Sequence, residues 1–201
     1  EITMKNVLIT GHNGYIGPHM IDVLRNIGGF NIFGCGINLF SDVAWRELPV
    51  PDVEWIKDFR DLTKKDLSQI DTVVHLAAIS NDPMGELDPN ITLNINAKGT
   101  VEFAKLCKAA GVKKFLMSSS CSIYGKSDKI DMVETDITDP LTTYAQSKIY
   151  VEEHLYNIGS SDFCVSFLRN STAYGDSPNL RIDLVVNNFL ACAVARNELR
   201  I

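Results

Sequence analysis

The chain has 201 residues, of which 45% are hydrophobic and 22% are charged. This length is enough for one sizeable domain, and this composition is typical of globular proteins, so a disordered tail is excluded. The 19 basic and 25 acidic side chains give a net charge of −6. An acidic balance without a run of Lys or Arg argues against nucleic acid or anionic lipid as the partner and favours a small molecule.

The cysteines and histidines do not form a recognisable framework. There are five cysteines and four histidines, and they do not cluster at ligand spacing or form a C-x-x-C pair. We therefore expect no disulfide framework, no metal site and a reducing, cytoplasmic compartment. No stretch reaches the roughly 18 uninterrupted apolar residues of a membrane helix, and the first residues lack a signal-peptide pattern, so we expect no membrane partner.

Short β-branched runs alternate with longer helical patterns along the chain, which is typical of an α/β fold. Strands are expected at about residues 7–10, 31–35, 53–56, 71–77, 114–118 and 163–168. Helices are expected at about residues 18–27, 91–110, 142–158 and 183–196. The first helix has these candidate core positions: Ile21, Val23, Leu24 and Ile27. Right-handed crossovers between parallel strands predict a doubly wound, Rossmann-like sheet with its ligand site at the carboxyl ends of the strands.

A glycine-rich turn follows the first predicted strand directly and opens the first helix. Gly11, Gly14 and Gly17 stand at the spacing G-x-x-G-x-x-G. A tight turn, a close approach of the backbone to a pyrophosphate and close packing of the helix on the strand each favour a residue without a Cβ. The helix N-terminus supplies free N–H groups and the positive end of a dipole. The turn therefore predicts a nucleotide-binding site.

Tyr144 and Lys148 are four residues apart on a predicted helix, so their side chains leave the same face. A phenol with an ordinary pKa near 10 is a poor base at neutral pH, but a neighbouring ammonium favours the phenolate. Tyrosine and lysine at this spacing are common on helix surfaces. The pair indicates a catalytic function only together with the glycine turn and the serine-rich segment at residues 118–125.

The motif TGxxGYIG at residues 10–17 resembles the extended short-chain dehydrogenase/reductase family, which contains nucleotide-sugar epimerases and dehydratases. Further landmarks of that family recur in order, and these are DFRD at 58–61, HLAA at 75–78, NAKGT at 96–100, SSSCSIYG at 118–125 and YAQSK at 144–148. The resemblance covers essentially the whole chain. It implies a Rossmann-like domain that binds NAD and acts on a nucleotide sugar.

The resemblance also implies individual roles. The catalytic set would be Ser120 as hydrogen-bond partner of the reacting hydroxyl, Tyr144 as base and Lys148 as its electrostatic partner and ribose ligand. Asp58 and Phe59 would hold the adenine, and Asn96 would brace the backbone beside the cofactor. The implied cofactor-binding residues are Gly11, Asn13, Gly14, Tyr15, Ile16, Gly17, Asp58, Phe59, Leu76, Ala77, Ala78, Asn96, Ser118, Tyr144 and Lys148. The implied substrate-binding residues are Ser120, Ser122, Tyr144 and Thr172.

One position departs from the family pattern and bears on the choice of cofactor. The acidic residue that ends the second strand in this family and binds the ribose 2′-hydroxyl is replaced by Gly36, with Asn38 and Asp42 as the nearest polar candidates. No Lys or Arg lies between residues 28 and 45 to receive a 2′-phosphate. We therefore expect NAD as the cofactor, with NADP left open.

The residues after Ser120 bear on the reaction. Sugar 4,6-dehydratases of this family carry an Asp-Glu pair there, whereas this chain has Cys121 and Ser122. We expect an NAD-dependent epimerase that oxidises a nucleotide sugar transiently to a keto sugar and returns the hydride to the opposite face. Two alternatives stay open, a reductase of a non-nucleotide carbonyl and a catalytically incomplete NAD-binding module. A homodimer is also left open.

We expect a single NAD(P)-binding domain over residues 1–201, in which residues 170–201 lead into the substrate-binding region. Family members usually carry further strands and helices after this point. The C-terminal substrate domain is therefore expected to be largely absent or truncated.

Overall fold

The computed structural model describes residues 4–80, 82–129 and 131–199. Within these residues, six parallel strands form one sheet in the order β3-β2-β1-β4-β5-β6. The strands are β1 (Lys5–Thr10), β2 (Phe30–Gly36), β3 (Val53–Ile56), β4 (Thr72–His75), β5 (Lys114–Ser120) and β6 (Cys164–Asn170). This is the doubly wound, Rossmann-like sheet that the sequence predicts, and the expected fold class is confirmed.

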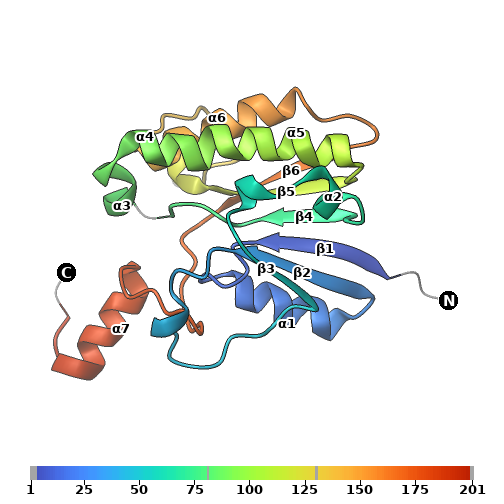
Figure 1. The fold of residues 1–201 in the computed structure, drawn as a ribbon. Coiled ribbons are helices and arrows are strands. Elements are labelled where there is room, and N and C mark those ends of the chain that lie inside the picture. Colours follow the sequence, from blue (N-terminus) through green and yellow to red (C-terminus); the bar gives the residue numbers. More distant parts are fainter. Residues whose placement is uncertain (1–3, 81, 130, 200–201) are drawn as a thin grey trace.

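Helices cover both faces of the sheet (Figure 1). The α-helices are α1 (Gly17–Ile27), α2 (Lys64–Leu67), α3 (Asp82–Leu87), α4 (Pro89–Thr92), α5 (Thr100–Ala110), α6 (Thr143–Tyr156) and α7 (Val185–Arg196). Figure 1 shows α1 on one face, α5 and α6 on the opposite face, and α7 beyond the carboxyl ends of the strands. Short 3-10 turns occupy Ser41–Val43, Phe59–Asp61 and Cys121–Tyr124, and a π-helical stretch occupies Leu93–Gly99. Among the described residues, no helix combines the length and apolarity needed to span a bilayer.

Residues 7–10 of β1 are buried, and successive side chains point to opposite faces of the sheet. Leu8 belongs to the larger core cluster on the side of α5 and α6, where it joins Phe115. Val7 and Ile9 belong to a second cluster that includes Ile21 of α1. The middle of β1, at residues 7–9, is therefore an uninterrupted apolar run, as is usual for parallel strands covered on both sides.

The chain leaves β1 toward β2 on one side and leaves β4 toward β5 on the other, so the strand order reverses between β1 and β4. In open α/β sheets, ligands bind outside the carboxyl ends of the strands at such a reversal. The turn that follows β1 and the segment that follows β4 therefore border the expected site.

Three details of the predicted elements are wrong. In α1, Val23 and Ile27 are 51% and 68% exposed, because the helix buries the stripe of Ile21 and Leu24 and turns the neighbouring stripe outward. The predicted helix at residues 91–110 is divided into α4, a π-helical stretch and α5. The predicted strand at 71–77 also ends two residues early, at His75.

Candidate active site

The glycine turn brings the end of β1 against the segment after β4. Gly11 has a φ of +70°, and a Cβ built on it would lie 2.9 Å from the backbone nitrogen of Ala77. The Gly11 N–H donates to the Cys35 carbonyl at 2.7 Å, and the Ala77 N–H donates to Thr10 Oγ1 at 3.3 Å. Only glycine combines this conformation with this approach, so the first glycine of the motif closes the turn.

The start of α1 suits an anion. Its N-cap residue, Ile16, makes no side-chain capping bond, Pro18 follows at the start of the helix, and its first turn holds no acidic side chain. The N–H groups of a helix start that no side chain satisfies bind phosphate well, and the helix dipole adds positive potential there. The turn at residues 11–17 thus fits a phosphate-bearing ligand on structural grounds.

Asn96 fixes the backbone that follows β4. It is 2% exposed and lies in the π-helical stretch Leu93–Gly99, a geometry that is frequent at functional sites. Its Oδ1 accepts from the Ile79 N–H at 2.9 Å, and its Nδ2 donates to the Ile79 carbonyl at 2.9 Å. Asn96 thereby anchors the segment that carries Leu76, Ala77 and Ala78.

Asp58 and Phe59 follow β3 and serve different purposes. Asp58 accepts from Arg60 Nε at 2.9 Å and Nη2 at 2.7 Å, and these bonds lower the pKa of its carboxyl. The side chain of Phe59 is buried, with its ring 4.8 Å from that of His75. Phe59 can therefore offer a ligand only its backbone, whereas Asp58 stays an ionised acceptor at the carboxyl edge of the sheet.

Tyr144 and Lys148 lie one turn apart on α6, which is capped at its N-terminus by Thr142. Lys148 is 5% exposed, its Nζ donates to the Ser118 carbonyl at 2.8 Å, and the same Nζ lies 5.3 Å from the centre of the Tyr144 ring. Burial lowers the pKa of Lys148 to about 8, and Glu152 opposes that shift. The helix thus presents a phenol and a buried amine to the end of β5.

Ser120 ends β5 and caps the 3-10 turn Cys121–Tyr124. Its Oγ accepts from the Ser122 N–H at 3.2 Å and from Ser122 Oγ at 2.9 Å. With two bonds accepted, the hydrogen of the Ser120 hydroxyl is left for donation to another group. Ser122 therefore polarises Ser120, a relationship that the spacing alone does not indicate.

The remaining expected residues lie around this centre. Ser118 Oγ accepts from Asn170 Nδ2 at 3.2 Å, which ties the end of β5 to the end of β6. Thr172 lies two residues beyond β6 and is exposed. The structure thus gathers Ser118, Ser120, Tyr144 and Lys148 at the ends of β5 and α6, and Thr172 lies on the loop that leaves the sheet.

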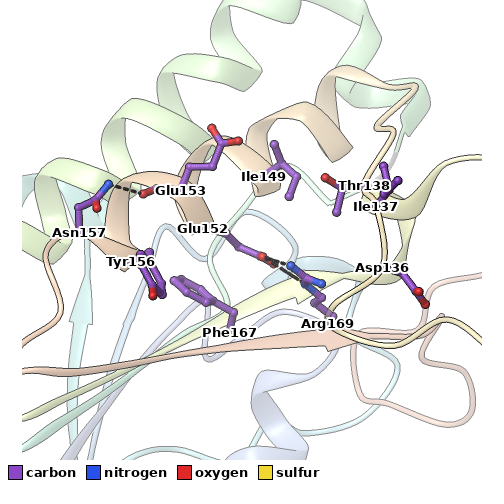
Figure 2. A pocket seen from close by; sticks show the side chains of 10 residues that line it. All are labelled: Asp136, Ile137, Thr138, Ile149, Glu152, Glu153, Tyr156, Asn157, Phe167 and Arg169. Atoms are coloured by element: carbon purple, nitrogen blue, oxygen red, sulfur yellow. Dashed lines mark hydrogen bonds and ion pairs between the residues drawn. The ribbon is translucent and has the colours of Figure 1, made fainter.

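A buried ion pair supports α6 and was not expected from the sequence. Glu152 and Arg169 form it at 2.7 Å between Oε2 and Nη2, and Ser119 Oγ donates to the other Glu152 oxygen at 2.5 Å. Figure 2 shows the pair among the side chains that line a hollow between α6 and β6. The sequence does contain a pattern that points to Glu152, because this residue continues the four-residue spacing of Tyr144 and Lys148 and so lies on the same helix face.

Residues 175–179, which follow β6, pack on the glycine turn. The Tyr15 hydroxyl donates to the Gly175 carbonyl at 2.8 Å, and Ser177 Oγ donates to the Tyr15 carbonyl at 2.7 Å. The Trp45 indole donates to the Ser177 carbonyl at 2.6 Å. These contacts join residues that are 132, 160 and 162 positions apart, so no local sequence signal predicts them.

Comparison with known proteins gives a family. The sequence model described as NAD dependent epimerase/dehydratase family matches residues 7–200. Among curated relatives, a probable UDP-glucuronate 4-epimerase of Rhizobium meliloti is 28% identical over 91% of this chain and 57% of its own length. A UDP-glucose 4-epimerase of Neisseria meningitidis serogroup C is 29% identical over 98% of this chain and 63% of its own length. The chain therefore spans less than two thirds of these relatives.

Solved structures share the fold. MoeE5, in complex with UDP-glucose and NAD, aligns with a TM-score of 0.79 at 30% identity, over 93% of this chain and 60% of its own. TunA, described as an NAD-dependent NDP-hexosamine 5,6-dehydratase, aligns with a TM-score of 0.86 at 27% identity, over 98% of this chain and 64% of its own. Epimerases and a dehydratase are thus both among the similar proteins.

Proposed function

Because the chain belongs to the NAD-dependent epimerase/dehydratase family, we propose that it binds NAD and takes part in the epimerisation of a nucleotide sugar through a keto-sugar intermediate. The observation that carries this proposal is that Lys148 contacts both the Tyr144 ring and the Ser118 carbonyl of β5, the strand that ends at Ser120. The relatives named as UDP-sugar 4-epimerases support the substrate class.

The residues around the strand-order reversal fit NAD. The pyrophosphate would lie on the glycine turn and the start of α1, where the backbone is bare and the N–H groups have no side-chain cap. Asp58 and the Phe59 backbone would hold the adenine, and the segment at 76–78, braced by Asn96, would support the nicotinamide half. The chemistry that NAD supplies when bound is the acceptance and return of a hydride.

Tyr144 is the proposed general base. It removes the proton of the sugar hydroxyl as that carbon is oxidised, and it returns a proton when the ketone is reduced. The ammonium of Lys148 favours the phenolate through its charge and holds its place through the Ser118 carbonyl. Ser120, whose oxygen already accepts two bonds from Ser122, donates its hydrogen to the reacting oxygen and stabilises charge that develops on it.

We propose epimerisation in preference to dehydration. Elimination of water across a sugar bond needs an acid and a base beside the catalytic hydroxyl. The two residues that follow Ser120 are an exposed Cys121 and Ser122, whose hydroxyl is bonded to Ser120. The likeness to TunA shows that the fold is compatible with either reaction, so the proposal rests on these two side chains.

We also propose that the chain is a single NAD-binding domain in which residues 170–201 lead into the substrate region. Asn187 of α7 supports this, because its Nδ2 donates to the Tyr15 hydroxyl at 3.0 Å and to the Arg181 carbonyl at 2.8 Å. One side chain thus joins the start of α7 to the glycine turn. A sugar nucleotide bound along this segment would lie next to the cofactor.

The experiment is an incubation with UDP-glucose or UDP-glucuronate and a trace of NAD, with the product analysed by mass spectrometry and NMR. An epimerase yields a product of unchanged mass and inverted configuration without net consumption of cofactor. A product lighter by one water contradicts the preference for epimerisation. In a parallel incubation that contains NADH in an amount equal to the substrate, stoichiometric consumption of NADH contradicts the proposed reaction as a whole.

A further inference from the structure

At the end of β2, two side chains of the glycine turn occupy the space beside Gly36. A Cβ built on Gly36 would lie 2.5 Å from Asn13 Oδ1 and 3.3 Å from His12 Nδ1. Real Cβ atoms essentially never approach other atoms as closely as the first of these distances. Asn13 and His12 therefore occupy the volume that a larger side chain at position 36 would need.

Asn13 is held with its side-chain oxygen, Oδ1, toward Gly36. Its Nδ2 donates to Asn38 Oδ1 at 2.7 Å, and its backbone carbonyl accepts from Asn179 Nδ2. Asn38 adopts a φ of +55°, which is uncommon for a residue other than glycine. Because the amide nitrogen is used by Asn38, the carboxamide oxygen of Asn13 is the atom that faces Gly36.

His12 provides a second acceptor at the same place. It is 2% exposed, and its Nε2 lies 2.7 Å from Glu54 Oε1 on β3. Among the residues the structure describes, its buried Nδ1 has no hydrogen-bond partner. When Nε2 carries the proton toward the Glu54 carboxylate, the Nδ1 of the neutral ring is a hydrogen-bond acceptor. A buried polar atom without a partner costs free energy unless a ligand satisfies it.

We propose that Asn13 Oδ1 and His12 Nδ1 together accept hydrogen bonds from the adenosine ribose of NAD, in place of the carboxylate that position 36 lacks. This proposal rests on the proposed function. A ribose 2′-hydroxyl has a hydrogen to donate to these acceptors, whereas the 2′-phosphate of NADP presents only further acceptors. The chain therefore discriminates against NADP because the two acceptors would stay without a hydrogen bond. It does not use the negative charge of an acidic residue at the end of β2 for this purpose.

The test is calorimetric titration of the protein with NAD and with NADP, which differ only in the 2′-phosphate. Wild type is expected to bind NAD more tightly. Asn13→Ala is expected to weaken NAD about tenfold and NADP much less, since it removes one hydrogen bond that only the hydroxyl makes. Asn13→Asp loses the donation to Asn38 but keeps an acceptor and adds a charge, so it should bind NAD better than Asn13→Ala does and weaken NADP further. His12→Phe should shift the ratio of the two affinities in the same direction as Asn13→Ala.

Asn31→Ala is the matched control. Asn31 also forms an asparagine pair, with Nδ2 donating to Asn6 Oδ1 at 2.8 Å, but it lies near the opposite end of β2. It should leave the ratio of NAD to NADP affinity unchanged. NAD binding with an unchanged ratio in the Asn13 or His12 variants would overturn this proposal alone. A wild-type protein that binds neither dinucleotide would overturn the proposed function and this proposal with it.

Discussion

Lys148 Nζ lies 5.3 Å from the centre of the Tyr144 ring and donates to the carbonyl of Ser118 at 2.8 Å. Lys148 is 5% exposed, so the charge of its amine acts in a medium with little water to screen it. A hydrogen bond to a strand carbonyl holds the amine in place even though its side chain is long. This geometry joins α6 to β5 at the point where the proposed chemistry occurs.

Removal of the Tyr144 hydroxyl should abolish turnover and leave cofactor binding nearly intact. A positioned general base contributes about 10²-fold or more to the rate, so Tyr144→Phe should lower kcat by at least that factor. Tyr150→Phe is the control, because Tyr150 lies on the same helix and stacks on His154. Steady-state kinetics together with NAD titration make the measurement. Retention of more than about a tenth of the activity would refute the role of Tyr144 as base.

Neutralisation of Glu152 should shift the pH dependence of the reaction. Glu152 opposes the effect of burial on Lys148, whose pKa is about 8, so Glu152→Gln should lower that pKa further. Lys148 would then lose its proton at a lower pH, and the alkaline limb of kcat would move to lower pH. Glu153→Gln changes the exposed neighbour on the same helix and should leave the limb in place. An unmoved limb in Glu152→Gln, or a shift to higher pH, would contradict this account.

Truncation of Asn96 should loosen the segment after β4. Asn96→Ala removes both bonds to the Ile79 backbone and leaves two polar groups without their partner, which should cost about 2–4 kcal/mol in the free energy of unfolding. Asn94→Ala, at an exposed position of the same π-helical stretch, should cost little. Urea unfolding measures the stability, and hydrogen exchange measures the protection of the Ile79 amide. Equal costs for the two variants would be incompatible with the bracing role.

A methyl group at Gly11 should damage both the fold and the cofactor site. Gly11 and Gly28 have similar positive φ angles of +70° and +75°, but a Cβ meets Ala77 only at Gly11 and open space at Gly28. Gly28→Ala should therefore cost about 1–3 kcal/mol for its conformation alone, because a φ of 75° with a ψ of 171° is populated almost only by glycine. Gly11→Ala should cost more and should weaken NAD. Thermal unfolding and NAD titration of the two variants compare them directly, and similar effects on NAD would refute the role of close approach.

Most of the sheet could be predicted from local patterns. The strand expected at residues 53–56 coincides with β3, and β5 and β6 extend two residues beyond the predicted carboxyl ends. Apolar β-branched runs between turn residues make such strands recognisable. The 3-10 turns and the short helices α2 and α3 were missed, since elements this short depend on caps and tertiary contacts rather than on hydrophobic periodicity.

In the candidate site too, local patterns identify some residues, whereas contacts between distant parts of the chain cannot be predicted from them. Tyr144 and Lys148 could be found because their spacing is local and places them on one helix face. The pairs His12–Glu54 and Glu152–Arg169 could not, because 42 and 17 residues separate their members and only the packed sheet brings them together. Gly36 was noticed as a missing acid, but the side chains that fill its place come from the neighbouring turn after β1.

The most direct test of the central claim is mass spectrometry of the ligand that denaturation releases from the purified protein, accompanied by titrations with NAD and NADP. The account predicts that NAD is retained, or that the emptied protein binds NAD in preference to NADP. A protein that releases no dinucleotide and binds neither, or one that prefers NADPH, would contradict it.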